Sequence, residues 1–84
     1  MKIKLFHQIG LGGEDSAAVR KFISDNGLKD VIEFFNIKYD ESRAAAQALT
    51  GSVEAPVLDV DGKAIRGREL ILDWLRTNVL AQRE

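Results

Sequence analysis

The chain has 84 residues, of which 45% are hydrophobic and 30% are charged, a composition typical of a small folded domain rather than of a disordered segment. Its net charge is −1 and its lysines and arginines are scattered, which argues against nucleic acid as a partner because no run of cations could neutralise a row of phosphates. It contains no cysteine, and this excludes disulfides, thiolate metal sites and thiol–disulfide exchange carried out by the chain itself.

Nothing along the chain divides it, because there is no linker, internal repeat or low-complexity segment. We therefore expect a single domain over residues 1–84, with residues 81–84 as a loose tail. The apolar runs are far shorter than the ~20 residues that span a bilayer, and the start of the chain lacks the continuous apolar segment of a signal peptide. We expect a cytoplasmic protein with no membrane partner.

The first elements along the chain are a strand and a helix. Residues 2–7 alternate lysine with aliphatic side chains and place Phe6 on the lysine face, which predicts a half-buried strand. A glycine-containing loop follows over residues 8–15. The spacing of apolar residues then predicts a helix from about Ser16 to residue 28. The residues of its apolar stripe are Val19, Phe22 and Ile23.

A second strand and helix come next. Residues 31–37 are rich in valine, isoleucine and phenylalanine, which predicts an interior strand with Phe34 and Phe35 on opposite faces. Residues 40–49 then predict a helix whose alanine face allows close approach to the sheet. The alanines of that face are Ala44, Ala45 and Ala48.

Residues typical of helix caps and helix ends flank these two predicted helices. Asp15 or Ser16 is expected to cap the free N–H groups of the first helix, and Gly27 to end it in the left-handed conformation. Asp40 is expected to cap the second helix, and Gly51 to stop it.

The last part of the chain predicts a hairpin followed by a helix. Asp61 and Gly62 form the strongest short-range turn signal of the sequence, between strands at residues 57–60 and 63–65. Gly67 then lets the backbone enter a final helix. Its apolar stripe is expected to contain Leu70, Ile71, Trp74 and Leu75. The predicted order is β-α-β-α-β-β-α, with the first two strands parallel and the hairpin completing a mixed four-stranded sheet.

This order and its punctuation resemble a known fold. The chain resembles the glutaredoxin-like members of the thioredoxin-fold family, and also the N-terminal domain of glutathione transferases. The features that carry the resemblance are the proline before the third strand (Ala55-Pro56), the Asp-Gly hairpin turn, and Gly67 at the start of the last helix. The resemblance covers residues 2 to about 80. It implies an α/β thioredoxin-like fold of the minimal glutaredoxin type, with strand order 2-1-3-4, three flanking helices and a cis-proline at Pro56.

The first half departs from the family's pattern. Residues 13–16 (Gly-Glu-Asp-Ser) stand where the family carries Cys-x-x-Cys, so Gly13 replaces the nucleophilic cysteine and Ser16 the resolving one. The resemblance therefore implies a redox-inactive protein, because thiol–disulfide exchange needs a thiolate.

The resemblance implies a binding site at the cis-proline edge for a peptide or a small anionic ligand such as glutathione. The partner would be a small thiol peptide or an extended protein segment. In this family the residue before the cis-proline offers its backbone to the ligand, and the start of the last helix holds a carboxylate. The ligand-binding residues implied are Gln8, Ser16, Ala55, Pro56, Gly67, Arg68 and Glu69.

Each of these residues also has a purely structural interpretation. Pro56 could simply begin an edge strand, and Glu69 stabilises a helix start without any ligand. Arg66 and Arg68 could pair with an anion or remain solvated surface charges.

Two alternative functions remain open from the sequence. The first is a glutathione transferase-like enzyme in which Ser16 assists the ligand's thiol, although Ser16 also suits a helix cap. The second is a protein–protein interaction domain with no small-molecule site.

Other chemistry has little support in the sequence. His7 is the only histidine, and a general base would need a nucleophile or a metal beside it. The loop at residues 10–13 invites a phosphate-binding interpretation, but Glu14 and Asp15 place negative charge where the phosphate would lie. We expect no cofactor and no metal.

Overall fold

The computed structural model describes residues 1–83 of the chain. Its strands and α-helices are β1 (Ile3–His7), α1 (Glu14–Asp25), β2 (Ile32–Asn36), α2 (Asp40–Thr50), β3 (Val57–Val60), β4 (Lys63–Arg66) and α3 (Arg68–Leu75). Short turns of helix complete it: 3₁₀ turns at η1 (Lys29–Val31) and η3 (Ala81–Arg83), and a π turn at η2 (Arg76–Leu80). Of the predicted tail at residues 81–84, residue 84 lies outside the described residues.

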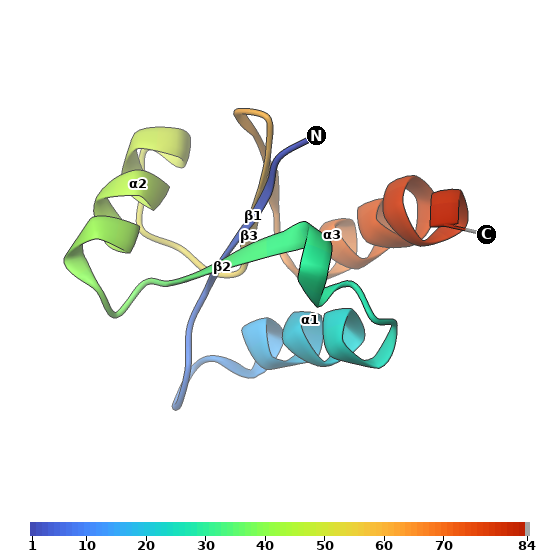
Figure 1. Cartoon of the computed structure of the whole chain (residues 1–84). Helices are drawn as coiled ribbons and strands as arrows, with labels where there is room; N and C mark the ends of the chain where they lie inside the picture. The colour runs from blue at the N-terminus through green and yellow to red at the C-terminus, as the bar shows by residue number, and fades with distance from the viewer. Residues whose placement is uncertain (84) are drawn as a thin grey trace.

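The four strands form one mixed sheet of order β2-β1-β3-β4. β1 runs parallel to β2 and antiparallel to β3, and β3 pairs with β4 as the predicted hairpin. In Figure 1, α2 lies on one side of the sheet, and α1 and α3 lie on the other. The predicted element order and strand order are both confirmed.

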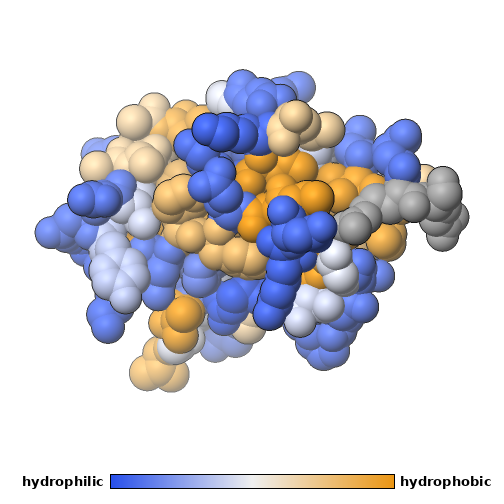
Figure 2. All heavy atoms as spheres, viewed as in Figure 1, coloured by the Kyte–Doolittle hydropathy of each residue, from blue (hydrophilic) through white to orange (hydrophobic). Residues whose placement is uncertain are grey.

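Alternation along β1 divides the core between the two faces of the sheet. Leu5 points to the α1 and α3 side, where the larger cluster lies, and Phe6 points to the α2 side. The larger cluster contains Ile3, Leu5, Val19, Ile23, Leu28, Ile32, Leu58, Ile71, Leu72, Leu75 and Val79. The smaller one contains Phe6, Ala46 and Val57. In Figure 2 an apolar area occupies the middle of the visible face, near where β1 and α3 lie in Figure 1, with hydrophilic residues around it.

Helix α1 begins and ends for different reasons. It starts two residues earlier than predicted, and its N-cap is Gly13 with no side-chain cap, so the predicted capping by Asp15 or Ser16 is wrong. Its end matches the prediction: Gly27 has φ of +66° and donates to the Ser24 carbonyl, and Leu28 donates to Ile23. These two bonds form the Schellman motif, which satisfies carbonyls at the helix end.

Helix α2 packs through a different face from the one predicted. Ser42 and Ala46 are buried, whereas the alanines expected against the sheet (Ala44, Ala45, Ala48) are exposed. The prediction failed because small residues occur on several sides of this helix, so composition did not identify the inward side. Asp40 is the first helical residue and pairs with Arg43 instead of capping, while Gly51 ends the helix in the left-handed conformation as predicted.

Strand β2 is not interior, as its composition predicted, but lies at an edge of the sheet. Its aromatic residues do lie on opposite faces. Phe35 packs beside Phe6 with ring centroids 5.5 Å apart, and Phe34 contacts His7 on the other side. Because α1 covers that side incompletely, Phe34 remains 37% exposed.

Helix α3 buries Ile71 and Leu75 as predicted, together with Leu72. Leu70 was expected in the same stripe but is 62% exposed. The buried stripe is therefore rotated toward Leu72, away from Leu70, and Trp74 at its border is only half-buried. No helix within residues 1–83 is both long enough and apolar enough to cross a membrane.

Candidate functional site

Segments that are distant in sequence meet at one end of the sheet. The parallel strands β1 and β2 both finish there, with His7 opposite Asn36. The antiparallel strand β3 begins there, because Val57 lies opposite Phe6, and β4 finishes there with Arg66 opposite Val57. Ligands of open α/β sheets commonly bind beyond the carboxyl ends of parallel strands.

The start of β3 supplies a backbone edge, which we call the docking edge (Ala55, Pro56 and Gly67). The Ala55–Pro56 peptide bond is cis. The Gly67 N–H donates to the Pro56 carbonyl at 3.3 Å, which ties the edge to the start of α3. Ala55 is only half-buried, and within residues 1–83 its own N–H and C=O make no hydrogen bond. These two groups are therefore available to an extended ligand.

The start of α3 differs in detail from the predicted carboxylate site. Gly67 has φ of +87° and begins the helix, but its N–H is already bonded to Pro56. The backbone N–H groups of Arg68 and Glu69 come next, and groups in a first helical turn have no partner within the helix. A carboxylate would therefore meet Arg68 and Glu69 rather than the amide of Gly67.

The two arginines beside this helix start already have partners. Arg68 lies 3.7 Å from the carboxylate of Asp15 on α1 and 3.8 Å from that of Glu69. Arg66 donates to the carbonyl of Thr50 at 2.7 Å. Its Nε also lies 3.0 Å from Oε1 of Glu54, an ion pair that is not aligned as a hydrogen bond. A ligand carboxylate would have to compete with these acidic groups.

The loop between β1 and α1 is closed around Ser16. Ser16 is 1% exposed, and its Oγ accepts the backbone N–H of Gln8 at 3.0 Å. This burial counts against the predicted role of Ser16 in lining a groove or assisting a thiol. The Gln8 carbonyl accepts from Arg20, and the Gln8 side-chain amide donates to Leu11, so Gln8 holds the loop together.

Gly13 is packed against the same loop. A Cβ atom at this position would lie 2.7 Å from the Gln8 carbonyl oxygen and 3.1 Å from that of Gly10. The first distance is shorter than real Cβ contacts, and both neighbours are backbone. The position that matches the family's nucleophilic cysteine therefore admits no side chain unless the loop moves.

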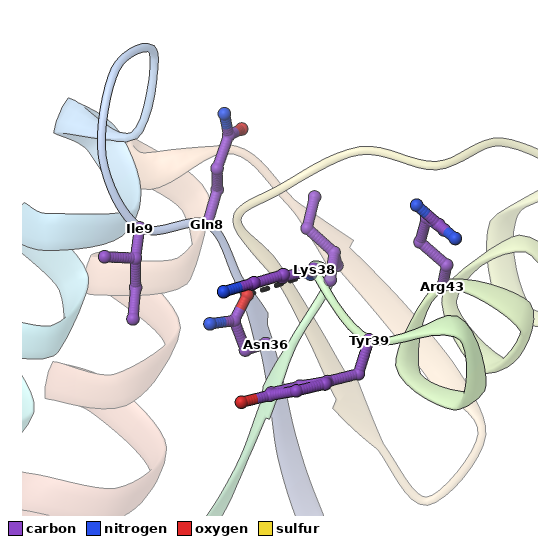
Figure 3. A pocket seen from close by; sticks show the side chains of 7 residues that line it. Gln8, Ile9, Asn36, Lys38, Tyr39 and Arg43 are labelled. Atoms are coloured by element: carbon purple, nitrogen blue, oxygen red, sulfur yellow. Dashed lines mark hydrogen bonds between the residues drawn. The ribbon is translucent and has the colours of Figure 1, made fainter.

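A hollow of about 660 Å³ lies at the same end of the sheet, next to the ends of β1 and β2, and its volume is within the usual range for ligand sites. We call it the sheet-end hollow, and its lining residues are Gln8, Ile9, Asn36, Ile37, Lys38, Tyr39 and Arg43. In Figure 3 the side chains of Lys38, Asn36 and Tyr39 extend in the same direction, toward the segment that carries Ile9, and Arg43 stands apart on α2.

The cations of the sheet-end hollow are not equivalent. Arg43 forms an ion pair with Asp40 one turn earlier, whereas Lys38 makes no ion pair within residues 1–83. Asn36 accepts the backbone N–H of Lys38 at 2.9 Å, which fixes the turn that presents it. Lys38, Tyr39 and Arg43 were not predicted as site residues from the sequence. Their position just after the carboxyl end of β2 was the available signal.

His7 lies at the end of β1 on the α1 side and is 6% exposed. Burial, and secondarily the positive charge of Arg20, hold the pKa of His7 below its ordinary value of 6.5. Within residues 1–83 its side chain contacts Arg20 and the Phe34 ring, and neither is a nucleophile or an acid that would make His7 a catalytic base. Within the described part of the chain no group of His, Asp and Glu side chains is arranged to hold a metal ion.

No protein-family model and no curated protein matches the chain. Solved structures do match. A mutant of the thioredoxin-like protein BC3987 aligns with a TM-score of 0.70 and 21% identity over 90% of this chain and 96% of that chain. Buckwheat glutaredoxin in complex with glutathione aligns with a TM-score of 0.65 and 18% identity over 95% of this chain and 73% of that chain. A mutated buckwheat glutaredoxin gives a TM-score of 0.67 at 17% identity. The fold of this chain is therefore thioredoxin-like, of the kind found in glutaredoxins.

Proposed function

We propose that this chain is a redox-inactive, glutaredoxin-like binding module that holds a small anionic thiol peptide such as glutathione, or an extended protein segment of similar chemistry. The ligand's backbone pairs with Ala55 at the docking edge, and its anionic end lies toward Lys38 in the sheet-end hollow. The absence of cysteine leaves the chain with no thiolate of its own, so binding rather than exchange is the activity proposed.

One observation carries this proposal. At a single end of the sheet, the unpaired backbone groups of Ala55 precede β3, and the carboxyl end of β2, on the other side of β1, presents Lys38, a cation with no ion pair within residues 1–83. Backbone pairing recognises any extended peptide, and the cation adds a preference for a negatively charged one. The glutathione complex of a similarly folded glutaredoxin supports the choice of ligand.

The transferase-like alternative loses support from the geometry. Its proposed residue, Ser16, is buried and its Oγ already accepts the Gln8 N–H, so a ligand thiol could reach it only after the loop opened.

The interaction-domain alternative has one observation in its favour. A hollow of about 530 Å³ runs beside the edge strand β4, where Leu70 is exposed and Trp74 is half-buried. An exposed strand edge next to apolar side chains is a common place for a second chain to pair. Light scattering over a concentration series would detect self-association through this edge.

The test of the main proposal is a titration of the ¹⁵N-labelled protein with glutathione, followed by amide chemical shifts. Shifts are expected at Ala55, Val57 and Lys38. Lys38→Gln is expected to weaken binding about two- to fivefold, the value of one exposed charge contact.

Lys63→Gln on β4 is the matched control, because Lys63 is an exposed lysine outside the sheet-end hollow and should leave the affinity unchanged. No shift at millimolar glutathione, or shifts confined to residues outside this end of the sheet, would refute the proposal.

A further inference from the structure

A second hollow lies on the other side of β2, away from the sheet-end hollow. It has a volume of about 410 Å³, and we call it the α1-face hollow. It is bordered by His7, Arg20, Lys21, Ser24, Lys29 and Phe34. It shares no lining residue with the sheet-end hollow, and its volume is within the range of small-molecule sites.

Two aromatic rings border this hollow. The His7 and Phe34 rings meet edge to face, with centroids 5.8 Å apart and an interplanar angle of 88°. Phe34 is 37% exposed, so part of its ring is open to a further molecule. A planar ring packs favourably on such a surface, by an offset or an edge-to-face contact.

The protonation of His7 follows from its contact with Arg20. Nη1 of Arg20 lies 3.1 Å from Nδ1 of His7, and a guanidinium can only donate. Nδ1 must therefore accept, which makes the ring neutral and places its proton on Nε2. Burial and the neighbouring guanidinium both favour this neutral form. The Nε2–H makes no hydrogen bond within residues 1–83 and is not among the buried unpaired atoms, so this ring donor is open to the hollow that His7 borders.

Cations surround these rings. Arg20 uses Nη1 for both His7 and the Gln8 carbonyl, which leaves its other N–H groups free of those bonds. Lys21 is paired with Asp25 at 2.6 Å. Lys29 makes no ion pair within residues 1–83, and the Ser24 hydroxyl lies at the same rim. The rim therefore suits an anionic group, and the rings suit an aromatic one.

We propose that the α1-face hollow binds a small aromatic anion: a single aromatic ring that carries a carboxylate or phosphate group. The ring packs on Phe34 and His7, and the anionic group lies toward Lys29 and Ser24. This inference is independent of the proposed function at the docking edge.

The test uses phenyl phosphate and benzoate as probes, each titrated into the ¹⁵N-labelled protein. Cyclohexyl phosphate is the matched saturated probe, and it tests whether the aromatic ring matters. Amide shifts are expected at Ser24, Lys29 and Phe34, and the ring protons of His7, the only histidine, give a second signal. Cyclohexyl phosphate is expected to bind about two- to tenfold more weakly than phenyl phosphate, from loss of the aromatic contact.

Two variants separate this site from general surface attraction. Phe34→Leu keeps an apolar side chain and is expected to weaken phenyl phosphate about two- to tenfold. Lys29→Gln changes only an exposed side chain, so it remains informative if Phe34→Leu does not fold, and it is expected to weaken binding about two- to fivefold. Lys63→Gln, an exposed lysine that lines neither hollow, should leave binding unchanged.

The proposal would be supported if either probe shifts the amides of Ser24, Lys29 and Phe34 and if Lys29→Gln weakens the binding of that probe. The inference is overturned if neither probe shifts these residues at millimolar concentration, if phenyl and cyclohexyl phosphate bind equally, or if Lys63→Gln weakens binding as much as Lys29→Gln does.

Discussion

The docking edge and the loop at residues 10–16 lie at the same end of the sheet, yet they have opposite properties. At the docking edge, the backbone of Ala55 is unpaired and half-exposed. In the loop, the Ser16 Oγ already accepts the Gln8 N–H, the Gly13 N–H donates to the Gly10 carbonyl, and Gly13 has no room for a side chain. The first region can accept a ligand as it stands, and the second cannot.

The contrast between the docking edge and the loop shows which part of this site depends on side chains. Pairing at the docking edge uses main-chain groups, which the strand pairing positions whatever the neighbouring side chains are. Chemistry at the loop depends on two side chains, and here one position is a glycine against backbone and the other a buried serine bonded to Gln8. The proposed binding through main-chain groups therefore does not depend on the side chains at positions 13 and 16.

The largest effect is expected from Gly13→Ala, which tests how tightly the loop is closed. The new Cβ would overlap the Gln8 carbonyl oxygen, so the loop must shift, and we expect a loss of about 1–3 kcal/mol in the free energy of unfolding. Urea denaturation measures this loss. Glu14→Gln at the next residue, which is exposed, should change stability by less than about 0.5 kcal/mol. A Gly13→Ala variant as stable as the wild type would show that the loop has room for a side chain.

Ser16→Ala should have the next largest effect. It leaves the Gln8 N–H without its acceptor. The loss of an acceptor for a buried donor costs about 1–3 kcal/mol in the free energy of unfolding, and we expect a value near the lower limit because this hydrogen bond is only partly buried. Ser24→Ala, an exposed serine on the same helix, is the matched control and should be nearly neutral. Equal stability of the two variants would contradict a structural role for Ser16.

The pH dependence of stability tests the burial of His7. Because the pKa of His7 is lowered in the folded protein, the unfolded chain binds the proton more readily. This contribution to stability is therefore complete above the ordinary pKa of 6.5, and it is lost as the pH falls below 6.5 through the lowered pKa. Urea denaturation should show a steeper loss between about pH 7 and about pH 5 in the wild type than in His7→Gln. Identical slopes would show that His7 titrates normally.

The smallest effect is expected from Arg68→Gln, which removes the ion pair that joins the two regions. Both Arg68 and Asp15 are largely solvated, so the change should lower the free energy of unfolding by less than about 1 kcal/mol, and less again in high salt. A larger loss, measured in the same urea experiment, would mean that the docking edge and the loop are coupled through this contact.

The sequence was a good guide to the fold because its strongest signals are local. The turn at Asp61 and Gly62 and the left-handed ends at Gly27 and Gly51 each depend on a few adjacent residues. The alternation of β1 predicted a strand there, but the strand is buried on both faces rather than half-buried. The predictions that were wrong concern features that tertiary contacts determine. The inward face of α2 and the exposure of β2 depend on neighbouring elements that composition does not reveal.

The site was predictable in part for the same reason. Pro56 and Gly67 are marked by unusual residue types at characteristic places, but the bond between them, which uses the Gly67 N–H, follows only from the packed structure. Ser16 lies beside Gln8 because the loop folds back on β1. Lys38 and Tyr39 carry no motif, and they become candidates only when the carboxyl end of β2 is placed beside that of β1, at the same end of the sheet as the docking edge.

The most direct test of the central claim compares glutathione with S-methylglutathione, which has the same peptide backbone and charges but no free thiol. If the chain binds through the docking edge and does no chemistry at sulfur, both ligands should shift Ala55, Val57 and Lys38 with the same affinity. The account would be contradicted if the S-methyl compound failed to bind while glutathione bound with shifts centred on Gly13 and Ser16, because the loop would then be a thiol site after all.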